Sequence, residues 1–292
     1  MECRFCQSRN LKLLFSSQDV HGRHILSKDT FDIYQCHGCG VIFPETLVNG
    51  EYYAGYYPKD YYINETKSGF VNRMLSLFSK IVIRFKEFDI LKYSGAKGKD
   101  KIRILDIGCG AGDFLAGLKS AGFDKYGVEI NPQGCKKCQE KGLNVSPTEL
   151  IDAKFSSDYF DVITMWHVLE HLDKSVELLR EARRILKPGG VLILSTPNTG
   201  SWGFKYGLKN WFHLDAPRHL ILYNYKSLSL LLERAGFKVK CLRNYFYDYP
   251  LDLFWSLRES KLKYLIYPFY PLFKILGREA LTVVAVKGSE KG

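Results

Sequence analysis

Two pairs of cysteines near the beginning of the chain have the spacing of a metal site. Cys3 and Cys6 form one Cys-x-x-Cys pair, and Cys36 and Cys39 form a second, with residues 7–35 between them. Each pair can hold one edge of a tetrahedron, so the two pairs together supply the four soft ligands of a closed zinc site. Because four cysteines leave no open position on the metal, the spacing predicts a structural Zn²⁺ and not a catalytic one.

A glycine-rich turn with acids on either side has the pattern of a site for an adenosine cofactor. The turn contains Asp106, Gly108, Gly110 and Gly112. Glycines let the backbone bend sharply and let a ligand approach main-chain atoms. Glu129, about 20 residues further on, is placed to accept hydrogen bonds from ribose hydroxyls. NAD is disfavoured because Asp113 stands where a dinucleotide fingerprint has its third glycine, whereas Asp106 suits a cofactor with a cationic amino-acid end.

A second motif, His167-x-x-Glu170-His171, matches the inverted zinc-protease signature. Histidines four residues apart would share one face of a helix and could bind zinc. The motif follows directly after a predicted strand of the nucleotide-binding core, and no third ligand on a helix of its own is evident. The protease interpretation is therefore not favoured.

The elements that must position these residues alternate between strands and helices from residue 101 onward. Apolar runs at 102–107, 126–130, 160–165 and 191–195 predict strands, with helices between them, and 238–244 and 281–286 predict the last two strands. Such alternation requires a parallel sheet covered by helices on both faces. We therefore expect an α/β fold with a Rossmann-like, seven-stranded, mostly parallel sheet, preceded by the N-terminal four-cysteine zinc ribbon.

Segments 104–112, 127–130, 160–172 and 186–190 resemble the class I S-adenosylmethionine-dependent methyltransferases. More narrowly, the chain is similar to bacterial methyltransferases that join a cysteine-rich ribbon and a tyrosine-rich linker to this core. The resemblance implies S-adenosyl-L-methionine as cofactor. It implies that the turn around Asp106 holds the methionine end, that Glu129 binds the ribose, and that Trp166 and His167 line the pocket beside the sulfonium. The implied cofactor-binding residues are Asp106, Gly108, Cys109, Gly110, Gly112, Glu129, Ile130, Glu149, Leu150, Trp166 and His167.

A long segment after the fifth strand, at about 200–225, mixes aromatic and polar residues as an acceptor-binding cap would. His171 and His219 are the candidates for a general base, which is needed only where the acceptor must lose a proton. His213, Asp215 and Arg218 are candidates for acceptor binding, with Arg218 holding an anionic group. Capping and core-filling roles for the same side chains remain open.

Domain boundaries follow from changes in composition. We expect the ribbon over 1–48, a tyrosine-rich linker and an amphipathic helix over 49–98, and the methyltransferase domain over 99–292. The tyrosines of 51–62 are expected to pack the ribbon onto the main domain. The helix should lie over the core with a face made of Phe70, Met74, Leu77, Phe78, Ile81, Phe85 and Phe88.

A second insertion, at about 248–278, interleaves aromatic residues with lysine and arginine. One interpretation is an interfacial segment that touches a membrane and serves a lipid-linked acceptor. The alternatives are a helical cap over the pocket and a dimer contact.

The chain has 292 residues, 46% of them hydrophobic, which is enough for a full core. Its net charge of +11 suits an anionic partner, but without a run of five like charges nucleic acid is not the expected one. No segment has the pattern of a signal peptide or of a spanning helix, so we expect a cytoplasmic protein, with peripheral membrane contact left open.

The leading functional hypothesis is methyl transfer to a small-molecule, sugar or lipid-linked glycan acceptor. The alternative is a non-catalytic protein that keeps the cofactor fold and uses the ribbon and the basic surface for partners. The acceptor atom and the oligomeric state are left open.

Overall fold

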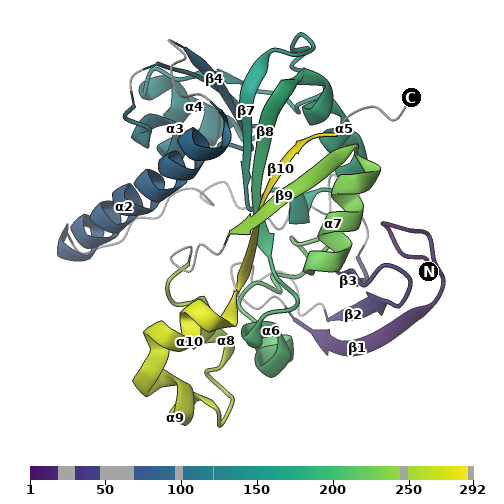
Figure 1. The fold of residues 1–292 in the computed structure, drawn as a ribbon. Coiled ribbons are helices and arrows are strands. Elements are labelled where there is room, and N and C mark those ends of the chain that lie inside the picture. The colour runs from purple at the N-terminus through teal and green to yellow at the C-terminus, as the bar shows by residue number, and fades with distance from the viewer. Residues whose placement is uncertain (19–29, 47–68, 96–100, 121, 244–248, 289–292) are drawn as a thin grey trace.

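The structure is a computed structural model that describes residues 1–18, 30–46, 69–95, 101–120, 122–243 and 249–288, with the backbone alone described for 69–76. Within these ranges a small three-stranded sheet accompanies a large seven-stranded one (Figure 1). The tyrosine-rich segment 51–62, which was expected to pack the ribbon onto the main domain, lies outside the described residues.

The small sheet carries the cysteine pairs. Its strands are β1 (Leu11–Ser17), β2 (Phe31–Cys36) and β3 (Ile42–Pro44), all antiparallel to their neighbours. The first pair precedes β1, and the second occupies the turn between β2 and β3. Gly40 closes that turn with a φ of 81°, a backbone conformation that glycine adopts without strain.

The large sheet has the order β6-β5-β4-β7-β8-β10-β9. Its strands are β4 (Ile102–Ile107), β5 (Phe123–Val128), β6 (Asn144–Ser146), β7 (Phe160–Trp166), β8 (Leu186–Pro197), β9 (Phe237–Arg243) and β10 (Ala280–Lys287). The first five strands in this order are parallel, and β10 is antiparallel to both of its neighbours. The predicted seven-stranded, mostly parallel sheet is confirmed. One detail differs: the turn expected at 187–190 lies inside β8, where the register with β7 shifts.

Helices cover both faces because successive strand residues point to opposite sides. Ile104 and Val162 join one apolar cluster with α3 (Asp113–Gly117) and α4 (Pro132–Glu140). Leu105 and Ile163 join the other with α5 (Ser175–Ile185) and α7 (Tyr225–Arg234). The sheet is therefore buried on both sides, as its continuous apolar runs require.

Helix α2 (Gly69–Tyr93) forms where the amphipathic pattern predicts it, but the predicted orientation is wrong. Its buried side chains include Ile83 and Ile90. Ile83 packs so closely on Gly117 of α3 that a Cβ added to this glycine would lie only 2.7 Å from Ile83 Cδ1. The stripe expected to face the core is instead exposed along its described part, from Leu77 to Phe88. The side chains of Phe70 and Met74 lie outside the described residues.

The two predicted insertions are largely helical. The first contains α6 (Trp202–Gly207) and the 3₁₀ turn η2 (Leu208–Asn210), and the second contains α8 (Asp252–Ser256), α9 (Lys263–Ile266), η3 (Tyr267–Phe269) and α10 (Tyr270–Gly277). They lie side by side at the lower end of the sheet in Figure 1, and α6 contacts α8. Among the described helices, none is both long and apolar enough to span a bilayer.

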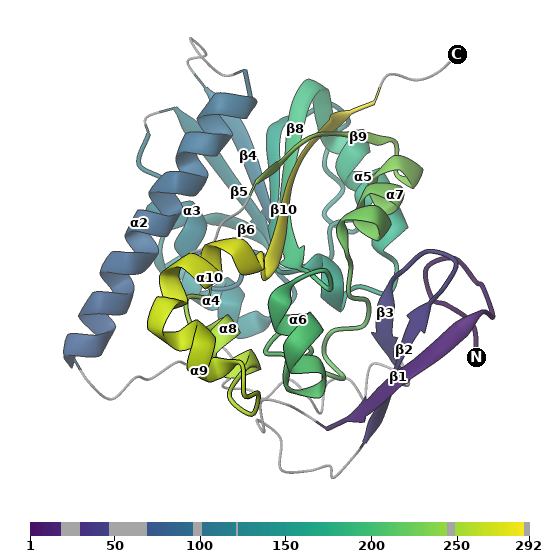
Figure 2. The same ribbon diagram turned by 60° about the horizontal axis from the view of Figure 1, so that its bottom comes forward.

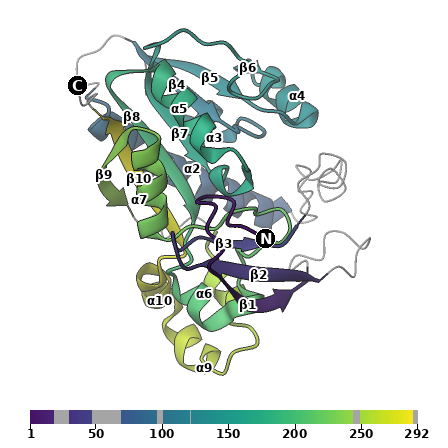
Figure 3. The same ribbon diagram turned by 90° about the vertical axis from the view of Figure 1, so that its right-hand side faces the viewer.

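The ribbon packs directly on the first insertion and on α7 (Figure 3). Ile42 of β3 and Leu222 exchange two backbone hydrogen bonds of 3.0 and 2.7 Å, which extends the small sheet by one bridge. Ile33 and Ile42 share an apolar cluster with Trp211 and Leu214. The ribbon thus contacts the main body through residues of β2 and β3.

Candidate functional site

The candidate site lies at the carboxyl ends of the central parallel strands, where α/β sheets bind their ligands. Asp106 near the end of β4 pairs with Thr164 of β7 and with Gly127 of β5. β7 ends at Trp166, and His167 follows it directly. The register therefore gathers the predicted cofactor residues and the histidine motif at one edge of the sheet.

The glycine turn between β4 and α3 requires glycine. Gly108, Gly110 and Gly112 all have positive φ, at 68°, 55° and 75°. A Cβ on Gly108 would lie 2.6 Å from Val168 Cγ2, and one on Gly112 would lie 2.5 Å from Leu143 Cδ1. The turn therefore has no side chain at its three glycines, and its main chain there can approach a ligand closely.

Two acids lie next to this turn in different surroundings. Burial raises the pKa of Asp106 to about 7, even though Thr164 Oγ1 donates to its Oδ1 at 2.7 Å. A buried carboxyl of this kind gains from a cation brought close to it. Glu129 accepts hydrogen bonds from the amides of Gly110 and Asn131, both at 2.8 Å. Its carboxylate is therefore fixed between the turn and the end of β5, where a ribose would lie.

The remaining predicted cofactor residues differ in accessibility. Ile130 is 67% exposed, so its side chain is free to cover an adenine. Leu150 is only 1% exposed and packs in the core, whereas Glu149 beside it is exposed. Cys109 is buried below the turn, with its Sγ 4.0 Å from Cys138 Sγ. Side-chain contacts of Leu150 or Cys109 with a cofactor are therefore not supported by this geometry.

Trp166 closes the side of the turn toward α2. Its ring meets Phe114 edge-on, with the centroids 5.3 Å apart, and Lys86 Nζ lies 3.9 Å above it. Lys86 belongs to the described half of α2 and also lowers the pKa of Asp106, so the helix contributes a cation to this end of the site.

His167 is held in an unusual conformation next to a buried acid. Its φ of 56° lies in the left-handed region, which side chains rarely adopt and which is often found at functional positions. His167 Nδ1 lies 3.3 Å from Glu170 Oε1, and Thr196 Oγ1 donates to Glu170 Oε2 at 3.0 Å. Among the described residues, the buried Nε2 of His167 has no hydrogen-bond partner.

Glu170 remains ionised although it is fully buried. Burial opposes ionisation, but the contact with His167 lowers the pKa of Glu170 to about 2. Among the described residues Glu170 Oε1 also has no hydrogen-bond partner, and an ionised carboxylate 3.3 Å from Nδ1 of His167 favours a proton on that nitrogen. The lone pair of His167 is then on the unpartnered Nε2, which is the arrangement of a general base with an orienting carboxylate.

The two histidines predicted as bases are held differently. His171 Nδ1 donates to the carbonyl of Arg218 at 3.0 Å, and His219 Nδ1 donates to the carbonyl of His213 at 2.8 Å. Burial lowers the pKa of His219 to about 3, so it stays neutral and is a weak base. The contact of His171 fastens the first insertion to the turn η1 (Leu169–His171), and that of His219 lies within the insertion. Both histidines suit a positioning role better.

The same turn removes the basis of the zinc-protease interpretation. η1 is a single 3₁₀ turn that begins at Leu169, so His167 precedes it and shares no helix face with His171. Instead, His219 comes close to Glu170 and His171, with potential ligand atoms within 4.8 Å of one another.

The predicted acceptor residues are buried in polar contacts of the two insertions. His213 Nε2 lies 3.0 Å from Asp252 Oδ2, and burial lowers the pKa of this histidine. Arg218 is fully buried, and its Nε donates to Asp215 Oδ1 at 2.9 Å. The expected role of Arg218 in holding an anionic acceptor is therefore not supported, because its charge is already balanced inside the protein.

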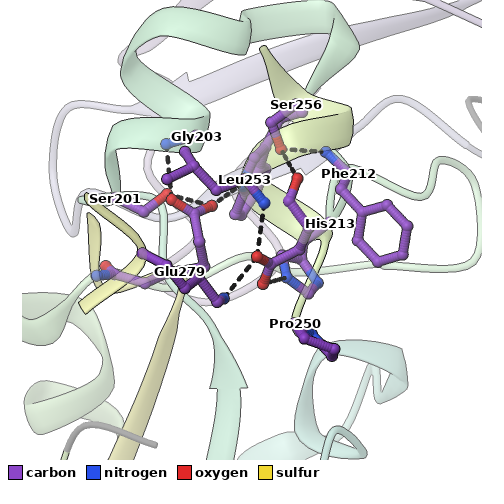
Figure 4. A network of polar contacts seen from close by, with 12 residues as sticks. Ser201, Gly203, Phe212, His213, Pro250, Leu253, Ser256 and Glu279 are labelled. Atoms are coloured by element: carbon purple, nitrogen blue, oxygen red, sulfur yellow. Dashed lines mark hydrogen bonds and ion pairs between the residues drawn. The ribbon is translucent and has the colours of Figure 1, made fainter. Parts of the chain in front are cut away.

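Figure 4 shows how the second insertion holds the first. Asp252 of α8 joins His213 to Lys274 of α10, whose Nζ lies 2.5 Å from Asp252 Oδ1. Glu279 accepts hydrogen bonds from Trp211 Nε1 at 3.0 Å and from the amide of Gly203 at 2.8 Å. These acids connect residues that are far apart in sequence, so spacing gave no signal for them.

Tyr249 is a site residue that sequence reasoning missed. Its ring centroid lies 4.9 Å from that of His167 and 5.3 Å from that of His213, and Phe212 lies beside it at 5.9 Å. The second insertion thereby places an aromatic ring next to the candidate base. The many tyrosines of this chain gave no reason to single this one out.

The four ribbon cysteines form a group that fits one zinc ion. The Sγ atoms of Cys3 and Cys39 lie 3.6 Å apart, and those of Cys6 and Cys36 lie 3.5 Å apart. Ligands about 2.3 Å from a tetrahedral zinc are about 3.8 Å apart. The Cys39 thiol donates a hydrogen bond that lowers the pKa of Cys3 to about 5 against the effect of burial, which favours a thiolate.

Comparisons with known proteins agree with the geometry of the sheet. A family model described as a methyltransferase domain matches residues 82–242, more than half of the chain. The ubiquinone biosynthesis O-methyltransferase of Actinobacillus pleuropneumoniae serotype 7 is 30% identical over 118 residues, which cover 37% of this chain and 49% of that protein. The chain thus spans about half the length of this relative. The protein of the same name from Haemophilus ducreyi is 26% identical over 194 residues, which cover 60% of this chain and 80% of that protein.

A solved structure shows the same fold. The structure of a geranyl diphosphate methyltransferase in complex with GPP and sinefungin has a TM-score of 0.50 and 15% identity, and it covers 70% of this chain and 78% of that one. At this identity the likeness concerns the fold alone.

Proposed function

The chain belongs to the class I S-adenosylmethionine-dependent methyltransferases, and from that premise we propose that it methylates a hydroxyl oxygen of a small-molecule acceptor, with His167 as general base. The observation that carries the proposal is the buried, unpartnered Nε2 of His167 beside the ionised Glu170. Membership in this family also favours an enzyme over a non-catalytic binding protein.

The residues around the glycine turn fit S-adenosyl-L-methionine. We assign the ammonium end of the cofactor to Asp106 and the amides of the turn, the ribose hydroxyls to Glu129, and one face of the adenine to Ile130. When bound, S-adenosylmethionine supplies a methyl group on a sulfonium that needs no further activation. The protein must therefore mainly align the acceptor and remove its proton.

His167 and Glu170 supply the proton chemistry. Nε2 of His167 would accept the proton that the acceptor hydroxyl loses when its oxygen takes up the methyl group. Glu170 stabilises the imidazolium that forms and keeps the ring in the required tautomer. Thr196 holds Glu170 in turn by the 3.0 Å hydrogen bond to Oε2. The His167–Glu170 distance of 3.3 Å is long for a hydrogen bond, as such contacts often are without substrate.

The surroundings of His167 support a small acceptor with an unsaturated or apolar part. Tyr249 and His213 place their rings beside it, and Phe212 lies next to Tyr249. The relatives named O-methyltransferases support oxygen as the acceptor atom. Sugars and lipid-linked glycans also carry hydroxyls and belong in the same acceptor screen.

We further propose that the four ribbon cysteines bind one structural zinc. The thiol separations of 3.5 and 3.6 Å support this. All four positions of a tetrahedral ion would be filled, so zinc would stabilise the ribbon and take no part in methyl transfer.

The base assignment is tested with His167→Asn. Losing a general base lowers kcat by about 10²- to 10⁴-fold. The affinity for S-adenosylmethionine, measured by calorimetry, should stay within about twofold, because its assigned contacts lie on β4 and β5. Methyl incorporation from radiolabelled S-adenosylmethionine into a panel of catechols, sugar nucleotides and lipid-linked sugars identifies the acceptor for the kinetic measurement.

His171→Asn is the matched control, because an asparagine amide can still donate to the carbonyl of Arg218. It should leave kcat within a few-fold of the unaltered chain. If His171→Asn abolishes turnover and His167→Asn does not, the base is misassigned. If no acceptor in the panel is methylated while S-adenosylmethionine binds, the acceptor proposal fails.

A further inference from the structure

The exposed stripe of α2 lies on the side of the helix that faces away from the sheet. Leu77, Ile81 and Phe88 recur at helical spacing on one face, and Phe88 is 62% exposed. The opposite face carries Ile83 and packs on α3. α2 is therefore held in place by one face and presents large apolar side chains outward on the other.

The second insertion presents a similar surface. Leu272 and Leu276 of α10 are exposed on one side of that helix, and Phe269 and Tyr264, the latter 76% exposed, precede them. The insertion is nonetheless well packed inside. Three of its side chains form a small core, which consists of Leu253, Leu257 and Ile266. Asp252 and Glu279 fix it to the body through buried polar contacts (Figure 4). Its outward apolar residues are therefore a surface of an ordered element.

The two elements that carry these residues lie on the same flank of the molecule. In Figure 1 α2 lies at the left and α8–α10 lie at the bottom, and in Figure 2 α10 lies next to α2. Arg243 at the end of β9, which leads into the second insertion, donates from Nε to Asp89 of α2 at 2.8 Å. This contact joins α2 to the strand that precedes the second insertion.

The charges on this flank select an anionic partner. The exposed charged residues of α2 among those described are all basic, namely Lys80, Arg84 and Lys92, because its acids Glu87 and Asp89 are buried. In α8–α10 and their connections the exposed charges are Arg258, Glu259, Lys261 and Arg278. A second copy of this chain would bring like charges together, whereas an anionic bilayer would pair with them.

We propose that the flank formed by α2 and α8–α10 docks on the surface of an anionic phospholipid bilayer. Aromatic and aliphatic side chains enter the interface, and lysine and arginine meet the lipid headgroups. The docking does not depend on the proposed function. A corollary that does rest on it concerns the acceptor: Tyr249 and Asp252 begin the docked insertion and contact His167 and His213. The acceptor therefore reaches the base from the lipid side, as a lipophilic molecule would.

Vesicle flotation tests the docking. The full chain should float with vesicles of phosphatidylcholine and phosphatidylglycerol, and binding should weaken with salt. Phe88→Asp combined with Leu272→Asp should reduce binding by about tenfold or more, because two apolar anchors become anionic. Lys80→Glu with Lys261→Glu should weaken binding to anionic vesicles as well. The matched controls are Leu13→Asp and Lys12→Glu on β1, which are also exposed but lie on the ribbon and should change nothing.

Several outcomes would overturn the proposal. They are no flotation of the full chain, equal binding to vesicles of pure phosphatidylcholine, and loss of binding in the ribbon controls. Sedimentation velocity can give a further contradicting outcome. If the full chain does not bind vesicles and Phe88→Asp with Leu272→Asp converts a dimer to a monomer, a second copy of the chain covers the flank. Methyl transfer to an acceptor in detergent solution is measured in parallel. If the proposed function is wrong, the chain still floats with vesicles. If the docking proposal is wrong, methyl transfer in detergent solution is still observed.

Discussion

Two buried carboxyl groups at the candidate site have pKa values shifted in opposite directions. Burial raises the pKa of Asp106 to about 7, whereas the contact with His167 lowers the pKa of Glu170 to about 2 despite its burial. Asp106 is thus ready to exchange a proton for a cation. Glu170 is a fixed anion that sets the tautomer of its neighbour. The difference in surroundings gives the two acids different tasks.

The raised pKa of Asp106 predicts that cofactor affinity depends on pH. Below pH 7 the carboxyl is mostly protonated in the free protein, so binding a cationic ammonium must release that proton. The Kd of S-adenosylmethionine should therefore weaken by about tenfold between about pH 8 and pH 6. Calorimetry in buffers of different ionisation enthalpy should detect the released proton. Asp106→Asn should bind more weakly at the higher pH and lose the pH dependence; an unchanged dependence in this variant would assign the proton elsewhere.

Residues with local signals were predictable, and residues positioned by distant contacts were not. The cysteine pairs and the acids around the glycine turn could be identified because their spacing along the chain sets their geometry. His167 was assigned to the cofactor pocket, since nothing in the sequence reveals its left-handed backbone or its distance to Glu170. Arg218 was expected to face a ligand, but Asp215 three residues earlier neutralises it.

At the scale of elements, the sequence pattern identified strands and helices better than it identified their orientation. The apolar periodicity of 70–88 correctly predicted α2. Periodicity shows that one face is apolar but not what covers that face. The sheet covers the side of α2 that carries Ile83. On the same side, Lys86 is buried by its contact with Trp166, and Glu87 is buried by hydrogen bonds from the amides of Lys119 and Ser120. No pattern in the helix itself shows such contacts.

The close packing of Gly203 of α6 on Glu279 predicts that a side chain at this position destabilises the fold. A Cβ there would lie 2.1 Å from Glu279 Oε2, while the amide of the same residue donates to Oε1 at 2.8 Å. Gly203→Ala must displace the carboxylate and disturb its hydrogen bond to Trp211, so we expect a loss of about 1–3 kcal/mol in the free energy of unfolding. Urea unfolding measures this. Gly38→Ala, where the added Cβ meets only ordinary contacts at 3.4 Å, should stay within about 0.5 kcal/mol. Equal losses in both variants would contradict the steric explanation.

At the scale of the whole molecule, the ribbon packs on the segment where the acceptor residues are predicted. Its cysteines Cys3, Cys36 and Cys39 belong to the same apolar cluster as one face of the large sheet. β3 bridges to Leu222, next to the buried segment that contains His213 and His219. The cofactor residues on β4 and β5 lie at the other side of the site (Figure 3). The ribbon can therefore influence acceptor binding without touching the cofactor.

This arrangement predicts a selective effect of losing the metal. Cys36→Ser with Cys39→Ser should lower bound zinc, measured by elemental analysis, and lower the melting temperature by about 5 °C or more, because structural zinc contributes folding energy. The loosened ribbon releases the β3–Leu222 bridge, so the KM for the acceptor should rise by about tenfold or more. The Kd of S-adenosylmethionine should change by less than about twofold, because β4 and β5 keep their own packing. A parallel rise of both constants would mean that the sheet as a whole has loosened, and unchanged constants with full loss of zinc would mean that the ribbon does not support the segment where the acceptor residues are predicted.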